Sequence, residues 1–423
     1  MKFNNKISGW PSFSQDEISV VQNVLGSNKV NYWTGEECKK FETEFALWLG
    51  CKHAVAVMNG TVAIEVALKA IGISFGDEVI VTPRSFFASV SPVVAVGAKP
   101  VFADVQLNSG NICPNSITKL ITRNTKAIIC VHLAGWPCDM DEIMQIAKEN
   151  NIMVIEDCAQ AHGAKYKGKN VGTIGDLGTW SFCQDKIITT GGEGGMVTCN
   201  DKTLMKALWS FKDHGKDFDL TRNLTAGNQF KWLHVAFGTN LRMTEMQAAI
   251  GRVQLKKLNE WTSLRTQNAQ AIIEAFSEFS RETPLIRQPE FQCSSCTCGR
   301  VDKGSGGLTK PSGSLETNGS CTHAYYKLYV YLELQNLKVG WTRERIIDEL
   351  MVKGVPCSIG SCPEIYLEKA FSGSTSGRIE RQKNAMELGE TSLMFLVHPS
   401  LTNDDIMLMK NAIRSVFTNA LKA

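Results

Sequence analysis

The sequence lacks long hydrophobic runs, and its charges nearly cancel. Its 423 residues include 45 Lys and Arg against 42 Asp and Glu, a formal net charge of +3. Such a balance argues against nucleic acid or an anionic membrane as a partner, because both attract concentrated positive charge. No apolar segment approaches the roughly 20 residues of a membrane-spanning helix. The polar start, MKFNNKISGWPSFSQDE, lacks the apolar centre of a signal peptide, so we expect a cytoplasmic protein.

Cysteine is present but dilute. Fourteen cysteines in a chain of 423 residues do not form the dense framework that holds small secreted domains together. Several lie in or beside apolar runs, where a reduced thiol packs as a small hydrophobic group: Cys130, Cys158 and Cys183. We interpret the cysteines as free thiols in a reducing compartment, in a chain long enough for two domains.

Apolar runs typical of buried strands alternate with helical patterns from His53 to Val197. The strand-like runs are continuous, which favours a parallel sheet covered by helices on both faces. Strands are predicted at 53–58, 77–82, 100–104, 127–132, 152–157 and 179–182, and helices at 61–70, 89–96 and 140–149. The pattern predicts an α/β fold with a large, mostly parallel sheet.

The C-terminal part differs in composition. A long helix is predicted from Met243 to Leu258, and we place the domain boundary inside it, between a large domain of residues 1–255 and a smaller α+β domain of residues 256–423. The smaller domain carries an insertion at 292–321 that is rich in Gly, Ser and Thr and is predicted to be an exposed loop. Its cysteines fit zinc-site spacings only loosely, so we favour incidental thiols over a metal site: Cys293, Cys296, Cys298 and Cys321. No metal is predicted.

The main candidate catalytic residues lie in the stretch from Val154 to Val197. Asp157 follows the apolar run IMVI, and Lys186 follows the run TWSF and precedes a cluster of glycines. Ligands of open α/β sheets bind at the carboxyl ends of the strands. A lysine for a Schiff base, an acid opposite a pyridine nitrogen and a phosphate site together suit pyridoxal phosphate (PLP). Lys186 alone would be interpreted as a surface lysine, but a carboxylate buried at Asp157 needs a cationic partner such as the protonated pyridine nitrogen.

Further candidate cofactor contacts each have a simpler alternative. Gly60 and Thr61 open a helix after a strand, where free backbone N–H groups bind anions, although Thr61 could simply cap the helix. Ser181 could join this phosphate site or bond nearby backbone. Gln160 could reach a ring hydroxyl of the cofactor or be a surface amide. Phe86 could stack on the pyridine ring or pack in the core.

The sequence resembles the DegT/DnrJ/EryC1/StrS family of PLP-dependent sugar aminotransferases over nearly its whole length. The segments that carry the resemblance are MNGTVAIEVAL, TPRSFFAS, HLAGWPCDMDEI, IEDCAQAHGA, SFCQDKIITTGGEGGMV and GTNLRMTEMQAAIGRVQLKKL. The resemblance implies the aspartate aminotransferase-like (type I) fold, with Lys186 bonded to the cofactor. The other cofactor contacts that it implies are Asp157 at the pyridine nitrogen, Gln160 at the ring hydroxyl, Phe86 on the ring face, and Gly60, Thr61 and Ser181 at the phosphate.

The same resemblance implies how the enzyme assembles and reacts. Asn240 matches a residue that reaches the cofactor of the neighbouring subunit, so the implied active unit is a homodimer with shared active sites. Family members that act as dehydratases carry histidine where this chain has Lys186. With lysine, an amino acid, most often glutamate, gives its amino group to the cofactor, which passes it to a sugar carbonyl, while Lys186 moves the proton.

Two departures from the family pattern bear on the sugar. Arg84 stands where many relatives have an apolar residue, and its guanidinium could bind a carboxylate; an arginine that caps a helix or pairs on the surface is the alternative. The run GSCPEIYLEKAF from Gly360 departs as well. These features favour an acidic sugar. The sequence as a whole resembles the subgroup of the family that aminates an 8-oxo form of 3-deoxy-octulosonate for lipopolysaccharide, and the resemblance implies that substrate. The alternatives are a nucleotide-linked 4-keto-6-deoxyhexose and, outside catalysis, a regulator that only binds PLP or a sugar.

Overall fold

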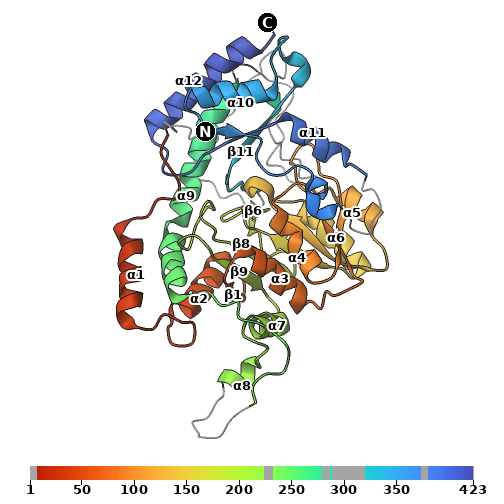
Figure 1. The fold of residues 1–423 in the computed structure, drawn as a ribbon, viewed down its shortest axis with the longest axis vertical. Helices are drawn as coiled ribbons and strands as arrows, with labels where there is room; N and C mark the ends of the chain where they lie inside the picture. The colour runs from red at the N-terminus through yellow and green to blue at the C-terminus, as the bar shows by residue number, and fades with distance from the viewer. Residues whose placement is uncertain are drawn as a thin grey trace.

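The larger unit of the protein is a sheet with helices on both faces (Figure 1). The computed structural model describes residues 7–222, 232–277, 279, 286–287, 320–372 and 380–422. Seven strands form this sheet in the order β1-β9-β8-β5-β4-β2-β3. They are β1 (His53–Val57), β2 (Glu78–Val81), β3 (Lys99–Phe102), β4 (Thr125–Val131), β5 (Met153–Asp157), β8 (Leu177–Ser181) and β9 (Gly195–Cys199). A separate hairpin joins β6 (Lys165–Tyr166) to β7 (Lys169–Asn170).

The sheet is mixed rather than fully parallel. The strands β2, β3, β4, β5 and β8 pair in parallel, whereas β9 is antiparallel to both of its neighbours, β1 and β8. The chain turns from β8 through a loop straight into β9, and a connection without a crossover helix joins antiparallel strands. The mostly parallel α/β sheet predicted from the sequence is confirmed, with β9 as its exception.

Alternate side chains of the central strands enter two separate cores, as the pleat requires. Ile80 packs on the face covered by α2, α6 and the first part of α9, while Val79 and Val81 pack on the face covered by α3, α4 and α7. The helices of this unit are α1 (Gln15–Ser27), α2 (Glu37–Leu49), α3 (Gly60–Ala70), α4 (Ser91–Ala95), α5 (Pro114–Leu120), α6 (Met140–Asn150), α7 (Lys202–Lys212), α8 (Phe218–Arg222) and α9 (Glu245–Ser277).

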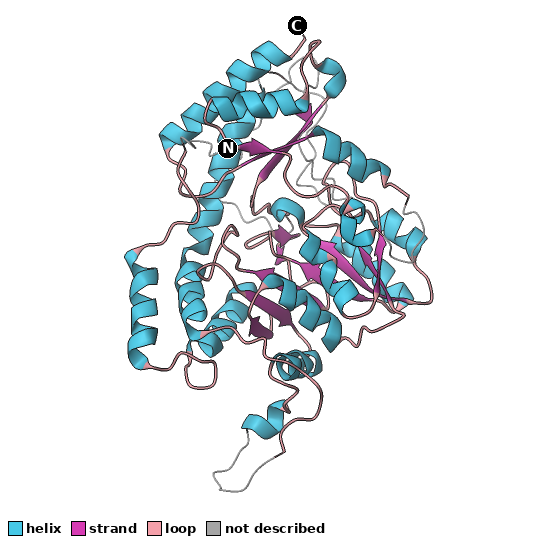
Figure 2. Cartoon of the chain, in the orientation of Figure 1, coloured by secondary structure: helices cyan, strands magenta, loops and turns pink. Residues whose placement is uncertain are grey.

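The helix α9 runs on from the large unit into a smaller one, which Figure 2 shows as a second group of strands and helices around the C-terminus. Its second half packs Ile272 and Phe276 against an antiparallel sheet in the order β10-β11-β13-β12. The elements here are β10 (Ile286–Arg287), β11 (Leu328–Leu332), β12 (Cys357–Ser358), β13 (Ser392–Phe395), α10 (Arg343–Val352), α11 (Lys383–Thr391) and α12 (Asn403–Ala420). The domain boundary at 255/256 falls inside the continuous α9 and stays a prediction.

The insertion at 292–321 lies outside the described residues except for its last two positions. Cys321 is one of these, and its Sγ accepts a hydrogen bond of 3.3 Å from the backbone N–H of Lys167. The prediction of an exposed loop, and the metal site that was the alternative there, therefore concern residues outside the described ranges. Within those ranges, no helix has the length and apolar character needed to cross a membrane.

Candidate active site

A cavity of about 520 Å³ opens at one edge of the large sheet. The strands β1, β2, β5 and β8 all end there, because β1 and β8 run parallel to each other through their shared antiparallel neighbour β9. The residues that line it include seven of the predicted cofactor contacts, namely Gly60, Thr61, Phe86, Asp157, Gln160, Ser181 and Lys186. This edge is where open α/β sheets bind their ligands.

The carboxylate of Asp157 is buried at the end of β5. Its Oδ2 accepts a 2.8 Å hydrogen bond from the hydroxyl of Ser89, and its Oδ1 accepts a 3.1 Å bond from the N–H of Ala159. The hydroxyls of Ser85 and Ser89 are 2.8 Å apart. Both serines also line the cavity and were missed from the sequence, because nothing near them marks them as neighbours of Asp157. Neutral donors orient the carboxylate, and no cationic side chain in the described part of the chain pairs with it.

Lys186 reaches the cavity from the loop that follows β8. Its backbone carbonyl accepts a 2.9 Å hydrogen bond from Nε1 of Trp10, which fixes the loop to the N-terminal segment. Its Nζ lies 4.9 Å from the ring centre of Tyr326 and 3.8 Å from Oδ1 of Asp185. The side chain of Lys186 is 15% exposed. Tyr326 donates a hydrogen bond to Asp185, so the amine faces an ordered pair that sequence spacing alone did not reveal.

Gly60 and Ser181 form a close contact at the N-terminus of α3. A Cβ built on Gly60 would lie 2.6 Å from the Cβ of Ser181 and 2.9 Å from its Oγ. The helix is capped by Asn59, whose side chain accepts a 2.9 Å bond from the N–H of Val62. The simple capping role considered for Thr61 is therefore wrong, and Thr61 instead presents an exposed side chain to the cavity. The first N–H groups of α3 face a small space that suits an anion.

Replacing Gly60 by alanine is expected to weaken cofactor binding. The new methyl group overlaps Ser181, and overpacking of this kind costs about 1–3 kcal/mol. We expect the dissociation constant for PLP, measured by titration of the apo protein, to rise about tenfold or more. The control is Gly26→Ala, because a Cβ on Gly26 meets nothing within 4 Å. Equal affinity in the two variants would contradict the close fit proposed here.

Phe86 and Gln160 both line the cavity, and the simpler alternatives considered for them are wrong. The side chain of Phe86 is 67% exposed although it lines the cavity, so it is not a core residue. Gln160 is buried, and its Oε1 accepts a 2.7 Å bond from the N–H of Ala134, so it is not a surface amide. Their contacts with the face and the hydroxyl of a cofactor ring stay predictions.

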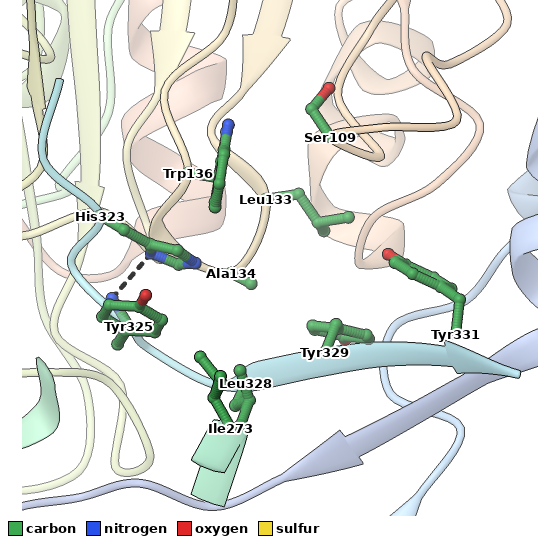
Figure 3. Close-up of a pocket in the computed structure, with 10 residues that line it drawn as sticks. All are labelled: Ser109, Leu133, Ala134, Trp136, Ile273, His323, Tyr325, Leu328, Tyr329 and Tyr331. Carbon is green, nitrogen blue, oxygen red and sulfur yellow. Dashed lines mark hydrogen bonds between the residues drawn. The ribbon is translucent and has the colours of Figure 1, made fainter. Parts of the chain in front are cut away.

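Arg84 and Asn240 are not among the residues that line this cavity. Arg84 is fully buried, so the alternative of a surface arginine is wrong, and its guanidinium stacks 5.5 Å from the ring centre of Tyr329 and 5.7 Å from that of Tyr331. Both tyrosines line a smaller cavity of about 100 Å³ (Figure 3), and Tyr329 lines the Lys186 cavity as well. Asn240 is exposed and forms an isolated backbone bridge with Asp213.

Glu156, next to Asp157 in the sequence, takes part in a buried polar network. The neighbouring Glu156 accepts hydrogen bonds of 2.7–2.8 Å from the N–H groups of Gly172, Ile174 and Gly175. Its Oε2 also lies 3.0 Å from Nε2 of His132. Since Nδ1 of His132 accepts from a backbone N–H, Nε2 carries the hydrogen and donates it. His132, Glu156 and Cys158 bring potential metal ligands together, but the ligand atoms of the first two are already occupied by these bonds.

Glu156→Gln is expected to lower the stability of the protein by about 3 kcal/mol, because an amide N–H₂ faces backbone donors that had an acceptor. The measurement is the urea midpoint of the apo protein, followed by circular dichroism. Glu149→Gln is the matched control, since Glu149 is exposed and accepts one bond of 2.9 Å from Gln145. A midpoint equal to that of the control variant would show that the network contributes little.

Comparison with known proteins identifies the family. The DegT/DnrJ/EryC1/StrS aminotransferase family model matches residues 11–414. The chain belongs to this family. It is accordingly a PLP-dependent sugar aminotransferase with the type I fold, and both expectations drawn from the sequence are confirmed.

Three relatives illustrate the likeness. An aminotransferase from Psychrobacter cryohalolentis, solved by X-ray crystallography, is 52% identical with a TM-score of 0.89, over 98% of this chain and 99% of that one. The GDP-perosamine synthase of Escherichia coli O157:H7 is 44% identical over 259 residues, 61% of this chain and 68% of the relative. The dTDP-3-amino-3,6-dideoxy-alpha-D-galactopyranose transaminase of Aneurinibacillus thermoaerophilus is 40% identical over 276 residues, 65% and 71% of the two chains.

The cavity of this aminotransferase fits the family cofactor. A buried carboxylate at Asp157 lacks a cationic partner in the described part of the chain, and a pyridinium nitrogen is such a partner. Gly60 and Thr61 line the cavity at the N-terminus of α3, a position suited to phosphate, and Gly60 brings Ser181 into close contact there because it has no Cβ. Lys186 brings to the same cavity an amine that can form a Schiff base.

Proposed function

We propose that this cavity holds PLP on Lys186 and transfers an amino group from an amino acid to a carbonyl carbon of a sugar. One observation carries the proposal: Asp157 at the end of β5 and Lys186 in the loop after β8 line one cavity together with Gly60 at the start of α3. A lysine and a buried carboxylate at one cavity are the two groups that the reacting carbon and the ring nitrogen of pyridoxal phosphate require. The roles below follow from these positions.

In this proposal each residue has a separate task. PLP supplies, when bound, an electron sink that depends on a protonated ring nitrogen. Asp157 holds that proton in place through its charge, and Ser89 orients the carboxylate. With the cofactor bound, the Nζ of Lys186 would take up the proton from the donor's α-carbon and later give it back, as a general base and then an acid. Asp185 and Tyr326 orient the amine while it is free.

For the acceptor we propose a nucleotide-linked 4-keto-6-deoxyhexose. Two of the similar proteins are, by their names, enzymes of GDP-linked and dTDP-linked sugars, and the first of them is 44% identical over the matched part. The cavity is bordered by Gly360, Ser361 and Cys362, so part of the departing run GSCPEIYLEKAF faces the space in which a sugar would lie. That run therefore bears on which sugar is accepted.

The octulosonate of lipopolysaccharide synthesis is the second candidate, and Arg84 is the observation that favours it. The guanidinium has no hydrogen-bond partner within the described residues, which leaves it available to a carboxylate. However, Arg84 has no exposed surface and does not line the Lys186 cavity. Because no surface of Arg84 is open to that cavity, we rank this candidate below the nucleotide-linked sugar.

We also propose that the enzyme works as a homodimer with shared active sites. Asn240 is exposed and lies away from the cavity of its own chain. An amide there can serve a cofactor only if it is presented to another subunit. Sedimentation of the holoenzyme tests the dimer, and a mixture of Asn240→Ala and Lys186→Ala chains tests whether a site is shared.

The acceptor is tested by incubating the holoenzyme with L-glutamate and one candidate sugar at a time. We expect amino sugar, identified by mass spectrometry, from a GDP- or dTDP-linked 4-keto-6-deoxyhexose. Turnover of the 8-oxo octulosonate alone would instead select the second candidate. Bleaching of the cofactor absorbance by glutamate, without any sugar, tests the first half-reaction separately. A regulator that only binds the cofactor would show the absorbance but no bleaching.

A further inference from the structure

The N-terminal segment at residues 7–10 lies against the loop that carries Lys186. It borders a cavity of about 250 Å³, and Asp185 and Tyr326 line both this cavity and that of Lys186. The indole Nε1 of Trp10 donates a 2.9 Å hydrogen bond to the backbone carbonyl of Lys186. The proposed function so far uses the amine of Lys186 but not this contact with its backbone.

The indole of Trp10 is held by side chains from separate elements. Its ring centre lies 5.1 Å from that of Trp261, edge to face, and 6.0 Å from that of His398, in a nearly parallel stack. The guanidinium of Arg265 lies 5.2 Å from the same indole. Trp261 and Arg265 belong to α9, whereas His398 follows β13 in the smaller unit. The N–H group that faces Lys186 is therefore held in one direction.

The two residues before Trp10 are bonded to the smaller unit. The hydroxyl of Ser8 donates a 2.8 Å bond to Oδ2 of Asp405, in the first turn of α12. The hydroxyl of Ser400 donates a 2.6 Å bond to the carbonyl of Gly9. These bonds add to the ring contacts in keeping Trp10 beside the loop after β8. The segment thus connects the smaller unit to that loop.

The position of the Lys186 amine depends on where its backbone lies, because lysine carries its charge on a flexible four-carbon stem. The N–H of Lys186 donates a local bond of 3.1 Å to the carbonyl of Cys183, and its carbonyl accepts the bond from Trp10. The first bond closes a turn within the loop, and the second ties that turn to a distant part of the chain. Since a misplacement of about 1 Å can cost about 10²-fold in rate, the second bond bears on the chemistry at Nζ.

We propose that Trp10 is a positioning residue, whose indole N–H holds the backbone of Lys186 where the amine can bond to the cofactor and move the proton. This inference rests on the proposed function, because it concerns the lysine of the same reaction. It also gives the bonds of Ser8 and Ser400 a role, since they keep the donor in place. A merely structural Trp10 would stabilise the fold without a separate effect on the bond between Lys186 and the cofactor.

The test compares two forms of the cofactor on the apo protein. PLP can bond to Lys186, whereas pyridoxamine phosphate has an amine in place of the aldehyde and binds without that bond. Trp10→Phe keeps an aromatic ring and removes the N–H, so we expect its dissociation constant for PLP to rise about three- to tenfold, the effect of one lost hydrogen bond. The dissociation constant for pyridoxamine phosphate should change by less than about twofold. Trp261→Phe is the matched control, because it alters a ring that packs on Trp10 but leaves the bond to Lys186 in place.

A second variant serves if Trp10→Phe fails to fold. Ser400→Ala removes the 2.6 Å bond to Gly9 and leaves the indole intact, so the ratio of the two dissociation constants should shift in the same direction by a smaller amount. Single-turnover bleaching by saturating L-glutamate should slow about three- to tenfold in Trp10→Phe as well. Equal changes in the two dissociation constants, or no change in either, would overturn the inference. If borohydride reduction of the unaltered enzyme leaves Lys186 without bonded cofactor, the proposed function is overturned instead.

Discussion

Lys186→Ala is expected to lower the rate of amino transfer about 10³- to 10⁴-fold, which is the contribution of a well-placed general acid–base. The Nζ of Lys186 sits at the Tyr326 ring and near Asp185, and the cavity wall shared with Asp157 includes no other lysine except Lys327. The amine of Lys327 also lies at the ring of Tyr326, 4.8 Å from its centre. We expect it not to replace Lys186 in the proton transfer, and the residue to which the cofactor is bonded tests this expectation.

The measurement for Lys186→Ala has two parts. Initial rates of 2-oxoglutarate formation give the loss of activity, and borohydride reduction followed by peptide mass analysis shows whether the cofactor is bonded to residue 186. Lys99→Ala is the control, because Lys99 is an exposed lysine that pairs with Glu78 at 3.0 Å far from the cavity. A reduced cofactor attached to Lys327 in the unaltered enzyme would contradict the assignment of Lys186.

The elements that position the site were predictable because their signals are local. The apolar run before Asp157 became β5, the run before Lys186 became β8, and the periodic segment after Gly60 became α3. Whether each segment forms a strand or a helix depends on the burial and the period of side chains within a few residues. The carboxyl ends of these strands then bring Asp157, Lys186 and Gly60 to one edge of the sheet, which the α/β pattern alone requires.

What the sequence did not predict depends on pairing over long distances. Ser89 reaches Asp157 from a short segment before α4, and its hydroxyl is indistinguishable in the sequence from any loop serine. Tyr326 and Arg265 enter from the smaller unit and from α9, where their patterns indicate only a strand and a helix. The direction of β9 has the same cause, since a buried apolar run fits either direction. Which side chains contact each other across separate elements depends on tertiary packing, and the local residue pattern does not determine it.

The single-residue alternatives show how context changes an interpretation. Judged alone, Phe86 was equally well explained as a core residue, and Thr61 as a helix cap. The structure exposes the first into the cavity and gives the capping role to Asn59. For Phe86, the outcome depends on which other side chains fill the core. For Thr61, it depends on Asn59, two residues earlier, whose side chain accepts the backbone N–H instead.

Asp157→Asn is expected to reduce amino transfer about 10²- to 10³-fold, the range for removing one preorganised charge from an active site. Asparagine has nearly the same volume and keeps an oxygen that can accept from Ser89 or Ala159, so the position stays filled. It cannot supply the negative charge that keeps a pyridine nitrogen protonated, and the cofactor then withdraws electrons less strongly. Single-turnover rates with saturating glutamate measure this loss directly.

The same variant separates a catalytic role from a structural one. In the apo protein Asp157 is a buried carboxylate whose hydrogen-bond donors among the described residues are neutral, and a charge without a cationic partner costs stability. Asp157→Asn should therefore leave the urea midpoint of the apo protein unchanged or raise it, while activity falls. Ser89→Ala is the matched control: it removes the 2.8 Å bond but keeps the charge, and its activity should fall less than tenfold. A lower midpoint together with an unchanged single-turnover rate in Asp157→Asn would make the carboxylate a structural group and would remove the basis for placing the ring nitrogen there.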